Sequence, residues 1–269
     1  MRKDEITLLI HSCHKFSDLW EAHIKLLNQN WPDRNIRTII LTDEDETVSF
    51  PDVEIISAGT GKEITDRIRY VLPLITTEYV LVTLDDYFPI YPIDGIKIDR
   101  LVSIMNETNM DYIRLFENPK FCKLTPAKFS DIFTFIFEGD YLVNLYVGIW
   151  RKDFMAATLS KESLSAWDYE VSLTSAAAKI NAKCAMSKGR EFPIMDVVRK
   201  GKILRCAAKY LKRYDLYHGP RPTRTIKETA LLYIRTQAKR ALSYGPEPLM
   251  RFIQKTMLRL GMNSFSGKK

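Results

Sequence analysis

Residues 79–88, YVLVTLDDYF, run from a largely apolar stretch directly into two adjacent carboxylates, Asp85 and Asp86. A largely apolar run of this length is typical of a β-strand that is buried on both faces. Two like charges at the end of such a strand repel each other unless a cation or hydrogen-bond donors lie near them. The segment therefore predicts a buried strand with a polar site directly after it.

Strand and helix patterns alternate in the chain before this segment. A buried strand is predicted at residues 5–13, further strands at 36–43 and 53–59, and helices at residues 18–32 and 61–75. The order β-α-β-β-α-β predicts an α/β fold with a Rossmann-like, mostly parallel sheet flanked by helices. In open sheets of this kind, ligands bind at the carboxyl ends of the strands. Asp85 and Asp86 are therefore expected at a ligand site.

Paired carboxylates at that position favour a divalent metal ion. Hard oxygen ligands suit Mg²⁺ or Mn²⁺, and these ions also bridge a diphosphate and neutralise the charge on it as it leaves. We therefore expect Asp85 and Asp86 to bind Mn²⁺ or Mg²⁺. The alternative is an ordinary polar turn that ends at Pro89.

The segment TLDDYF, residues 83–88, resembles the DxD motif of GT-A type glycosyltransferases, particularly the family 2-like enzymes of bacterial surface polysaccharide biosynthesis. Asp86 stands in the place of the last aspartate of the motif, and Thr83 or Leu84 in the place of the first. The resemblance implies a GT-A fold. It also implies metal-dependent transfer of a sugar from a nucleotide-diphosphate donor to a saccharide or lipid-linked acceptor.

A second similarity lies in WDYEVSLTSAAAK, residues 167–179. It resembles the family's carboxylate motif at the start of a helix, with Trp167 in place of the first acid on the acceptor side. The resemblance implies that Asp168 is the general base of an inverting enzyme and that Glu170 is a further catalytic candidate. The alternatives are a capping box formed by Ser165 and Asp168, and a first-turn acid at Glu170.

The segment YVGIWRKDFM, residues 146–155, resembles the acceptor-side segment of the same family. Gly148 would allow a close approach of the acceptor, and Trp150 would offer an aromatic face to a sugar ring. Trp150 as a core aromatic residue is the alternative.

Four polar residues outside these motifs are candidates for donor binding. His11 and Ser12 end the first strand, where they would line the nucleotide pocket together with Asp85. Asp43 closes the second strand, where family members hold the uracil or ribose of the donor. Arg67, on the helix at 61–75, would reach the diphosphate. A turn aspartate and a solvent-exposed arginine are the alternatives for the last two.

The charge distribution divides the chain into two parts. Residues 197–269 hold 18 lysines and arginines against 3 acidic residues, a net charge of +15, while residues 1–196 hold 22 against 30, a net charge of −8. This predicts a nucleotide-sugar and acceptor-binding catalytic domain at 1–196 and a basic helical C-terminal extension at 197–269. Helices are predicted at 225–244 and 247–261.

The basic extension predicts a polyanionic partner. The helix at 247–261 is amphipathic and basic, which favours peripheral contact with an anionic membrane; packing on the catalytic domain is the alternative. A basic nucleic-acid-binding protein with an α/β scaffold is the alternative function, but the acidic body argues against it, and no nucleic-acid partner is expected.

The expected location is the cytoplasm, with peripheral contact at the inner face of the cell membrane. The first ten residues lack a signal-peptide pattern, and no apolar stretch reaches the roughly 18 residues of a membrane span. The four cysteines are scattered, which argues against a disulfide framework.

Overall fold

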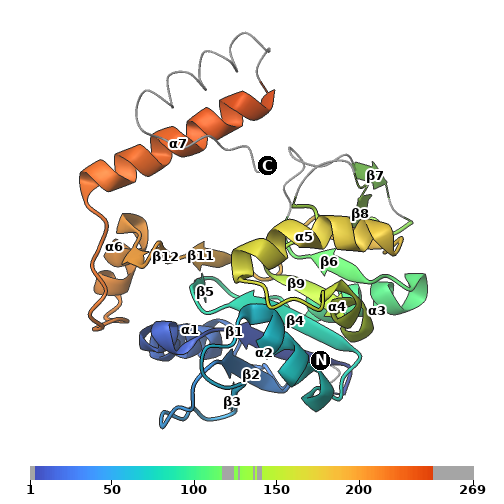
Figure 1. Cartoon of the computed structure of the whole chain (residues 1–269), viewed down its shortest axis with the longest axis horizontal. Coiled ribbons are helices and arrows are strands. Elements are labelled where there is room, and N and C mark those ends of the chain that lie inside the picture. The colour runs from blue at the N-terminus through green and yellow to red at the C-terminus, as the bar shows by residue number, and fades with distance from the viewer. Residues whose placement is uncertain (1–3, 117–123, 127, 136, 138–140, 245–269) are drawn as a thin grey trace. The chain divides into compact units, whose positions relative to one another are not determined.

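The structure is a computed structural model, which describes residues 4–116, 124–126, 128–135, 137 and 141–244. The chain divides into two compact units (Figure 1). The first comprises Met1–Val197 and Asp215–Pro220, and the second comprises Val198–Tyr214 and Arg221–Lys269.

The first unit contains a nine-stranded sheet with the order β3-β2-β1-β4-β9-β6-β10-β8-β7. Its strands are β1 (Ile6–His11), β2 (Thr38–Thr42), β3 (Glu54–Ser57), β4 (Tyr79–Leu84), β6 (Tyr112–Arg114), β7 (Leu124–Pro126), β8 (Ile132–Phe135), β9 (Gly148–Arg151) and β10 (Cys184–Ser187). The pairs β3-β2, β2-β1, β1-β4 and β6-β10 are parallel. Strand β9 is antiparallel to both of its neighbours, and the β8 and β7 edge is antiparallel as well. The predicted mostly parallel α/β sheet is confirmed.

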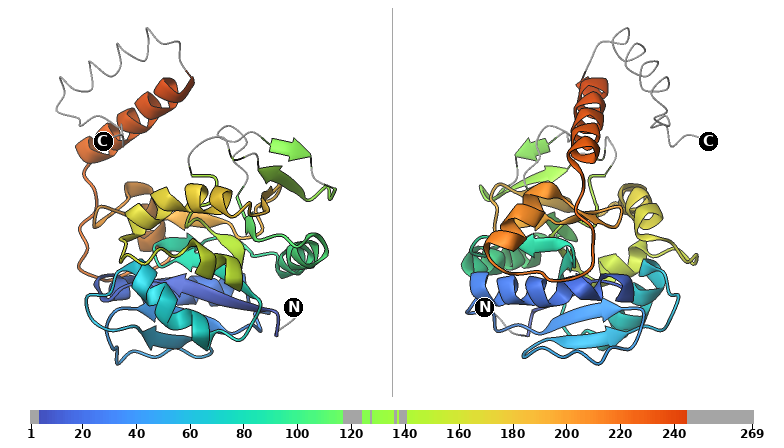
Figure 2. Two further views of the ribbon diagram at one scale, coloured as in Figure 1. Left: turned by 45° about the vertical axis from the view of Figure 1, so that its right-hand side comes forward. Right: turned by 90° about the vertical axis from the view of Figure 1, so that its left-hand side faces the viewer.

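Helices cover both faces of this sheet (Figures 1 and 2). They are α1 (Trp20–Asn30), α2 (Ile64–Val71), α3 (Gly95–Thr108), α4 (Lys152–Thr158) and α5 (Ala166–Lys179), with 3-10 helices at His14–Leu19 and Leu72–Leu74. Side chains of α1 and α3 form one apolar core, and those of α2, α4 and α5 form the other. Alternation along β1 supplies both cores, because Leu8 and Ile10 point to the first and Leu9 to the second.

A two-stranded sheet lies next to the carboxyl end of β4. Strand β5 (Tyr87–Pro89) pairs antiparallel with β11 (Ile194–Asp196), so that Tyr87 lies opposite Asp196. The backbone nitrogen of Val197 extends this pairing by donating to the carbonyl oxygen of Asp86 at 2.9 Å. A segment from late in the sequence is thereby fixed beside the acidic turn at Asp85 and Asp86.

In the second unit, the described residues form a short hairpin and two helices. Strands β12 (Val198–Arg199) and β13 (Lys202–Ile203) are joined by Lys200 and Gly201, both at positive φ. Helix α6 (Arg205–Arg213) follows, and α7 (Ile226–Tyr244) begins with a capping box in which Thr225 and Glu228 exchange hydrogen bonds. The predicted helix at 225–244 is α7; the one predicted at 247–261 lies outside the described residues.

Candidate active site

Helix α1 and strand β1 hold the first aspartate of the acidic turn. Asp85 is 6% exposed, and its Oδ2 atom accepts a hydrogen bond from the Ser12 hydroxyl. The Ser12 oxygen in turn accepts a hydrogen bond from Trp20 Nε1 at 2.7 Å. His23, one turn further along α1, bonds to the backbone carbonyl oxygen of Asp85 through Nδ1 at 2.9 Å. Asp85 is therefore bonded to protein groups through both its side chain and its backbone.

Asp86 is the more exposed member of the pair, since it is half-buried where Asp85 is buried. Among the described residues, no group of three or more His, Cys, Asp and Glu side chains forms a metal site. A fully enclosing protein cage is not required for Mg²⁺, which is usually bound through one or two carboxylates together with substrate phosphates. Two adjacent carboxylates, Asp85 and Asp86, are a donor set that fits an ion of that kind.

His11 lies buried at the carboxyl end of β1. Its side chain is 3% exposed, and neither ring nitrogen has a hydrogen-bond partner among the described residues. Burial, and after it the nearby positive charge of Arg67, lowers the pKa of His11 to about 3. The ring is therefore neutral at pH 7 and carries one donor and one acceptor nitrogen.

Arg67 points from α2 toward the carboxyl ends of β1 and β2, not into solvent. Its side chain is 11% exposed, and its Nη1 atom lies 4.0 Å from Asp43 Oδ2. Nη1 also donates to the carbonyl oxygen of Lys62, while Nε is buried without a partner among the described residues. Asp43 is oriented by the backbone nitrogen of His14, which donates to its Oδ1 at 2.7 Å. Arg69 points elsewhere, toward Asp66 and the carbonyl of Glu162.

The structure thus brings together the residues that the sequence predicts for the donor: His11, Ser12, Asp43, Arg67 and Asp85. Cys13, which sequence reasoning did not assign to this group, lies among them. The pKa of its thiol is raised, first by burial and then by the negative charges of Asp85 and Asp43. His11 and Arg67 both leave buried polar atoms unsatisfied here, which is typical of a site that a polar ligand completes.

A second group of polar residues surrounds Tyr87. The pKa of Tyr87 is raised by burial first and then by the negative charges of Asp86, Asp196 and Glu170. The ring of Tyr146 lies beside it, with 5.2 Å between the ring centroids. Sequence reasoning missed Asp196 and both tyrosines, because the strands that carry them are short and their pairing is not visible in any local pattern.

Asp168 and Glu170 differ in their surroundings, although both are near the start of α5. Asp168 is exposed, and it forms the capping box with Ser165: the Ser165 oxygen accepts from the Asp168 backbone nitrogen and donates to Oδ2 at 2.6 Å. Glu170 is half-buried and accepts from the backbone nitrogen of Leu145 at 3.3 Å. Burial raises the pKa of Glu170, which makes it a stronger proton acceptor than an exposed carboxylate.

The two residues predicted on the acceptor side in β9 have structural roles instead. Trp150 is 1% exposed and packs on Phe154 and Tyr112, with ring centroids 5.6 Å and 4.7 Å away. It is a core aromatic residue and offers no face to a sugar, because β9 lies in the middle of the sheet. At Gly148, an added Cβ would lie 2.8 Å from the Tyr112 ring, so the glycine is needed for this packing and not for a ligand.

Trp167, the third predicted acceptor residue, is on the surface. Its side chain is 62% exposed, and its ring centroid lies 6.2 Å from that of Tyr141, which is also exposed. Trp167 is in the first turn of α5, three residues before Glu170, and the ring of Tyr141 lies beside it. Exposed aromatic rings in this position can stack on the apolar face of a sugar.

Comparison with known proteins gives a distant structural likeness. No family model matches the chain, and no curated protein matches it. Among solved structures, the crystal structure of S. aureus TarS 1–349 is similar, with 12% identity over 71% of this chain and 59% of that chain and a TM-score of 0.46. A second crystal structure of S. aureus TarS has 11% identity over 71% of this chain and 36% of that chain, with a TM-score of 0.45. The chain spans less than two thirds of the length of both structures.

No described helix is both long enough and apolar enough to cross a membrane.

Proposed function

We propose that this protein is a glycosyltransferase that moves a sugar from a nucleotide-diphosphate donor to a saccharide or lipid-linked acceptor in cell-surface polysaccharide biosynthesis. One observation carries the proposal. Polar residues predicted for the donor gather at the carboxyl ends of β1, β2 and β4. The half-buried carboxylate of Glu170 lies near them, because its charge and that of Asp86 both raise the pKa of Tyr87. That end of the sheet is where α/β folds bind nucleotides.

The donor roles follow from the chemistry of each group. Asp43 accepts hydrogen bonds from the base or ribose, and Arg67 and the neutral ring of His11 supply hydrogen bonds to the nucleotide. Asp85 and Asp86 would hold a divalent ion, and that ion would supply positive charge to a departing diphosphate. Ser12 keeps Asp85 oriented by donating to its carboxylate.

The acceptor hydroxyl needs a general base, and Glu170 is the first candidate. Its raised pKa brings its proton affinity closer to neutral pH, and it lies within electrostatic reach of Tyr87, beside the acidic turn. Asp168 remains the second candidate, because the resemblance to the family places the base there. Direct attack by the acceptor with either base inverts the anomeric configuration. Trp167 and Tyr141 then provide a stacking surface for the acceptor saccharide.

A panel of nucleotide sugars tests the proposal. We expect one donor class to raise the melting temperature of the full chain, with a larger shift in Mn²⁺ than in EDTA. The same donor should release nucleoside diphosphate when acceptor saccharides are added. Arg67→Ala should abolish the shift, whereas the matched variant Arg100→Ala, an arginine of α3 outside the site, should keep it. If no nucleotide sugar stabilises the protein, the proposal is wrong.

A further inference from the structure

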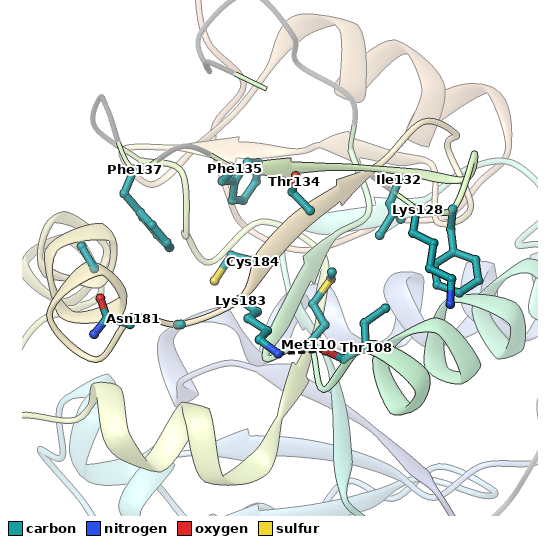
Figure 3. A pocket seen from close by; sticks show the side chains of 13 residues that line it. Thr108, Met110, Lys128, Ile132, Thr134, Phe135, Phe137, Asn181, Lys183 and Cys184 are labelled. Atoms are coloured by element: carbon teal, nitrogen blue, oxygen red, sulfur yellow. Dashed lines mark hydrogen bonds between the residues drawn. The ribbon is translucent and has the colours of Figure 1, made fainter. Parts of the chain in front are cut away.

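A cavity of about 700 Å³ lies at the edge of the sheet opposite the candidate active site. The end of α3, the strand β8 with the turn before it, the end of α5 and the start of β10 enclose it (Figure 3). Strands β6 and β10 are parallel to one another, and they begin at this edge, with Tyr112 and Cys184. The donor residues lie at the carboxyl ends of the parallel strands, so this cavity is a separate site.

The walls of the cavity are mainly apolar. Ile132, Phe135 and Phe137 line it on one side, and Met110 faces them from the other (Figure 3); Phe129 also lines the cavity. A volume of this size falls within the range of about 300–1,000 Å³ that small-molecule sites occupy. Apolar walls favour an apolar chain, because every apolar contact removes surface from water. A nucleotide or sugar phosphate would instead place many hydroxyl groups against these rings, more than the few polar side chains of the wall, such as Thr134 and Asn181, can bond.

Two lysines supply the charge of the cavity. Lys183 extends toward the end of α3, where its Nζ atom donates to the carbonyl oxygen of Thr108 at 3.2 Å, and Lys128 lies with Nζ 5.3 Å from the ring centroid of Phe129. No aspartate or glutamate is among the described residues that line the cavity. The nearby Asp111 accepts a hydrogen bond from the backbone nitrogen of Lys183, and its Oδ1 atom lies 3.9 Å from Arg151 Nε. The charge of Asp111 is therefore paired with that of Arg151.

We propose that this cavity binds a single-chain amphiphile with an anionic head group, of the fatty-acid class. The chain lies between the phenylalanines and Met110, and the carboxylate lies near Lys128 and Lys183. Among the described lining residues, apolar side chains and two cations without an acid match the apolar chain and the negative head group of this ligand. The proposal does not rest on the transferase activity.

A fluorescent fatty acid tests the binding directly. Cis-parinaric acid, which brightens in apolar surroundings, is titrated into the full chain and then displaced by dodecanoate or by the neutral dodecanol. We expect saturable binding, with dodecanoate displacing the probe at about tenfold lower concentration than dodecanol, because two exposed ion pairs contribute about that much. Absence of saturable binding, or equal displacement by the alcohol, would overturn the proposal.

Matched variants locate the bound probe. Ala178 and Ser175 are both exposed on α5, but only Ala178 lines the cavity. Ala178→Trp should weaken probe binding tenfold or more by filling the cavity, and Ser175→Trp should leave it unchanged; both should unfold at the melting temperature of the parent, within a few degrees. Equal probe affinity in the two variants would place the ligand elsewhere and overturn the proposal.

The charge is tested in the same way. The double variant Lys128→Gln and Lys183→Gln should lose the preference for dodecanoate over dodecanol, whereas Lys179→Gln, on α5 outside the cavity, should retain it. A preference that survives in the double variant would overturn the assignment of the head group.

Discussion

The ring nitrogen Nδ1 of His23 lies 2.9 Å from the backbone carbonyl oxygen of Asp85. A carbonyl oxygen only accepts, so Nδ1 carries the proton and donates it. The same helix also reaches the carboxylate of Asp85, because Trp20 donates to Ser12 and Ser12 donates to Oδ2. Helix α1 therefore holds both the backbone and the side chain of Asp85. Asp85 is buried and Asp86 is half-buried, so the two adjacent aspartates have different surroundings.

That difference predicts opposite phenotypes for two isosteric changes. Asp85→Asn replaces a buried charged acceptor, so it should lower the free energy of unfolding by about 1–3 kcal/mol, measured by urea denaturation. Asp86→Asn should change that free energy by less than about 0.5 kcal/mol, because the residue is half-buried. It should nevertheless weaken Mn²⁺-dependent donor binding at least tenfold in calorimetry. Unchanged donor affinity in Asp86→Asn would remove this residue from the metal site.

A second pair of variants separates the two base candidates. Glu170→Gln should reduce turnover by about a hundredfold or more with donor affinity nearly intact, as expected when a general base is lost. Asp168→Asn keeps an acceptor for the Ser165 hydroxyl, so it should retain most of the turnover and of the stability. The measurement is nucleoside diphosphate release under saturating donor. The reverse result would assign the base to Asp168 and leave Glu170 a structural role.

The donor end of the site could be predicted because it follows from long parallel strands. Strands β1, β2 and β4 are each five or six residues long, mostly apolar and almost continuously buried. Their ends can therefore be located in the sequence, and parallel pairing brings those ends to one edge of the sheet. His11, Asp43 and Asp85 meet for that reason. The orientation of Arg67 depends on the face of α2 on which it lies, and the local sequence does not determine that face.

The acceptor end could not be predicted to the same degree. Strand β9 is inserted antiparallel between β4 and β6, and this long-range pairing buries Trp150, which an isolated segment of four residues does not reveal. Asp196 reaches Tyr87 only through the pairing of β11 with β5. Contacts of this kind join short strands that are distant in the sequence, so neither hydrophobic periodicity nor a motif indicates them.

The buried histidine of the donor site predicts a pH dependence of stability. The native pKa of His11 is about 3, below its ordinary value of 6.5, so between these pH values the unfolded chain binds a proton that the native state does not. Protonation of His11 in the unfolded chain therefore leaves the free energy of unfolding unaffected above pH 6.5. As the pH falls from 6.5 toward 3, it lowers that free energy by up to about 1.4 kcal/mol per pH unit. His23, with a pKa of about 4, acts in the same direction.

Urea denaturation in metal-free buffer between pH 7 and pH 4.5 measures this slope. The variant His11→Gln should lose about 1 kcal/mol less per pH unit than the parent, since titration of the carboxylates is common to both proteins and cancels in the comparison. Parallel curves for the two proteins would mean that His11 is protonated in the native state, contrary to its burial.

The basic second unit predicts reversible attachment to anionic membranes. Helix α7 exposes Ile226, Tyr233 and Ile234, whose spacing of seven and eight residues puts them on one face. The predicted amphipathic helix at 247–261 lies outside the described residues. Its three cations, Arg251, Lys255 and Arg259, would contribute about 3 kcal/mol near an anionic bilayer, at about 1 kcal/mol each.

An attraction of that size supports peripheral binding and not permanent insertion, so salt should reverse it. The full chain should sediment with vesicles that contain phosphatidylglycerol, remain in solution with neutral vesicles, and leave the anionic vesicles in high salt. The triple change of Arg251, Lys255 and Arg259 to Gln should abolish sedimentation while turnover on a soluble acceptor analogue persists. Truncation after Gly245 should behave in the same way. If the full chain does not sediment with anionic vesicles, or binds duplex DNA more tightly than lipid, the assignment of this unit to membrane binding is wrong.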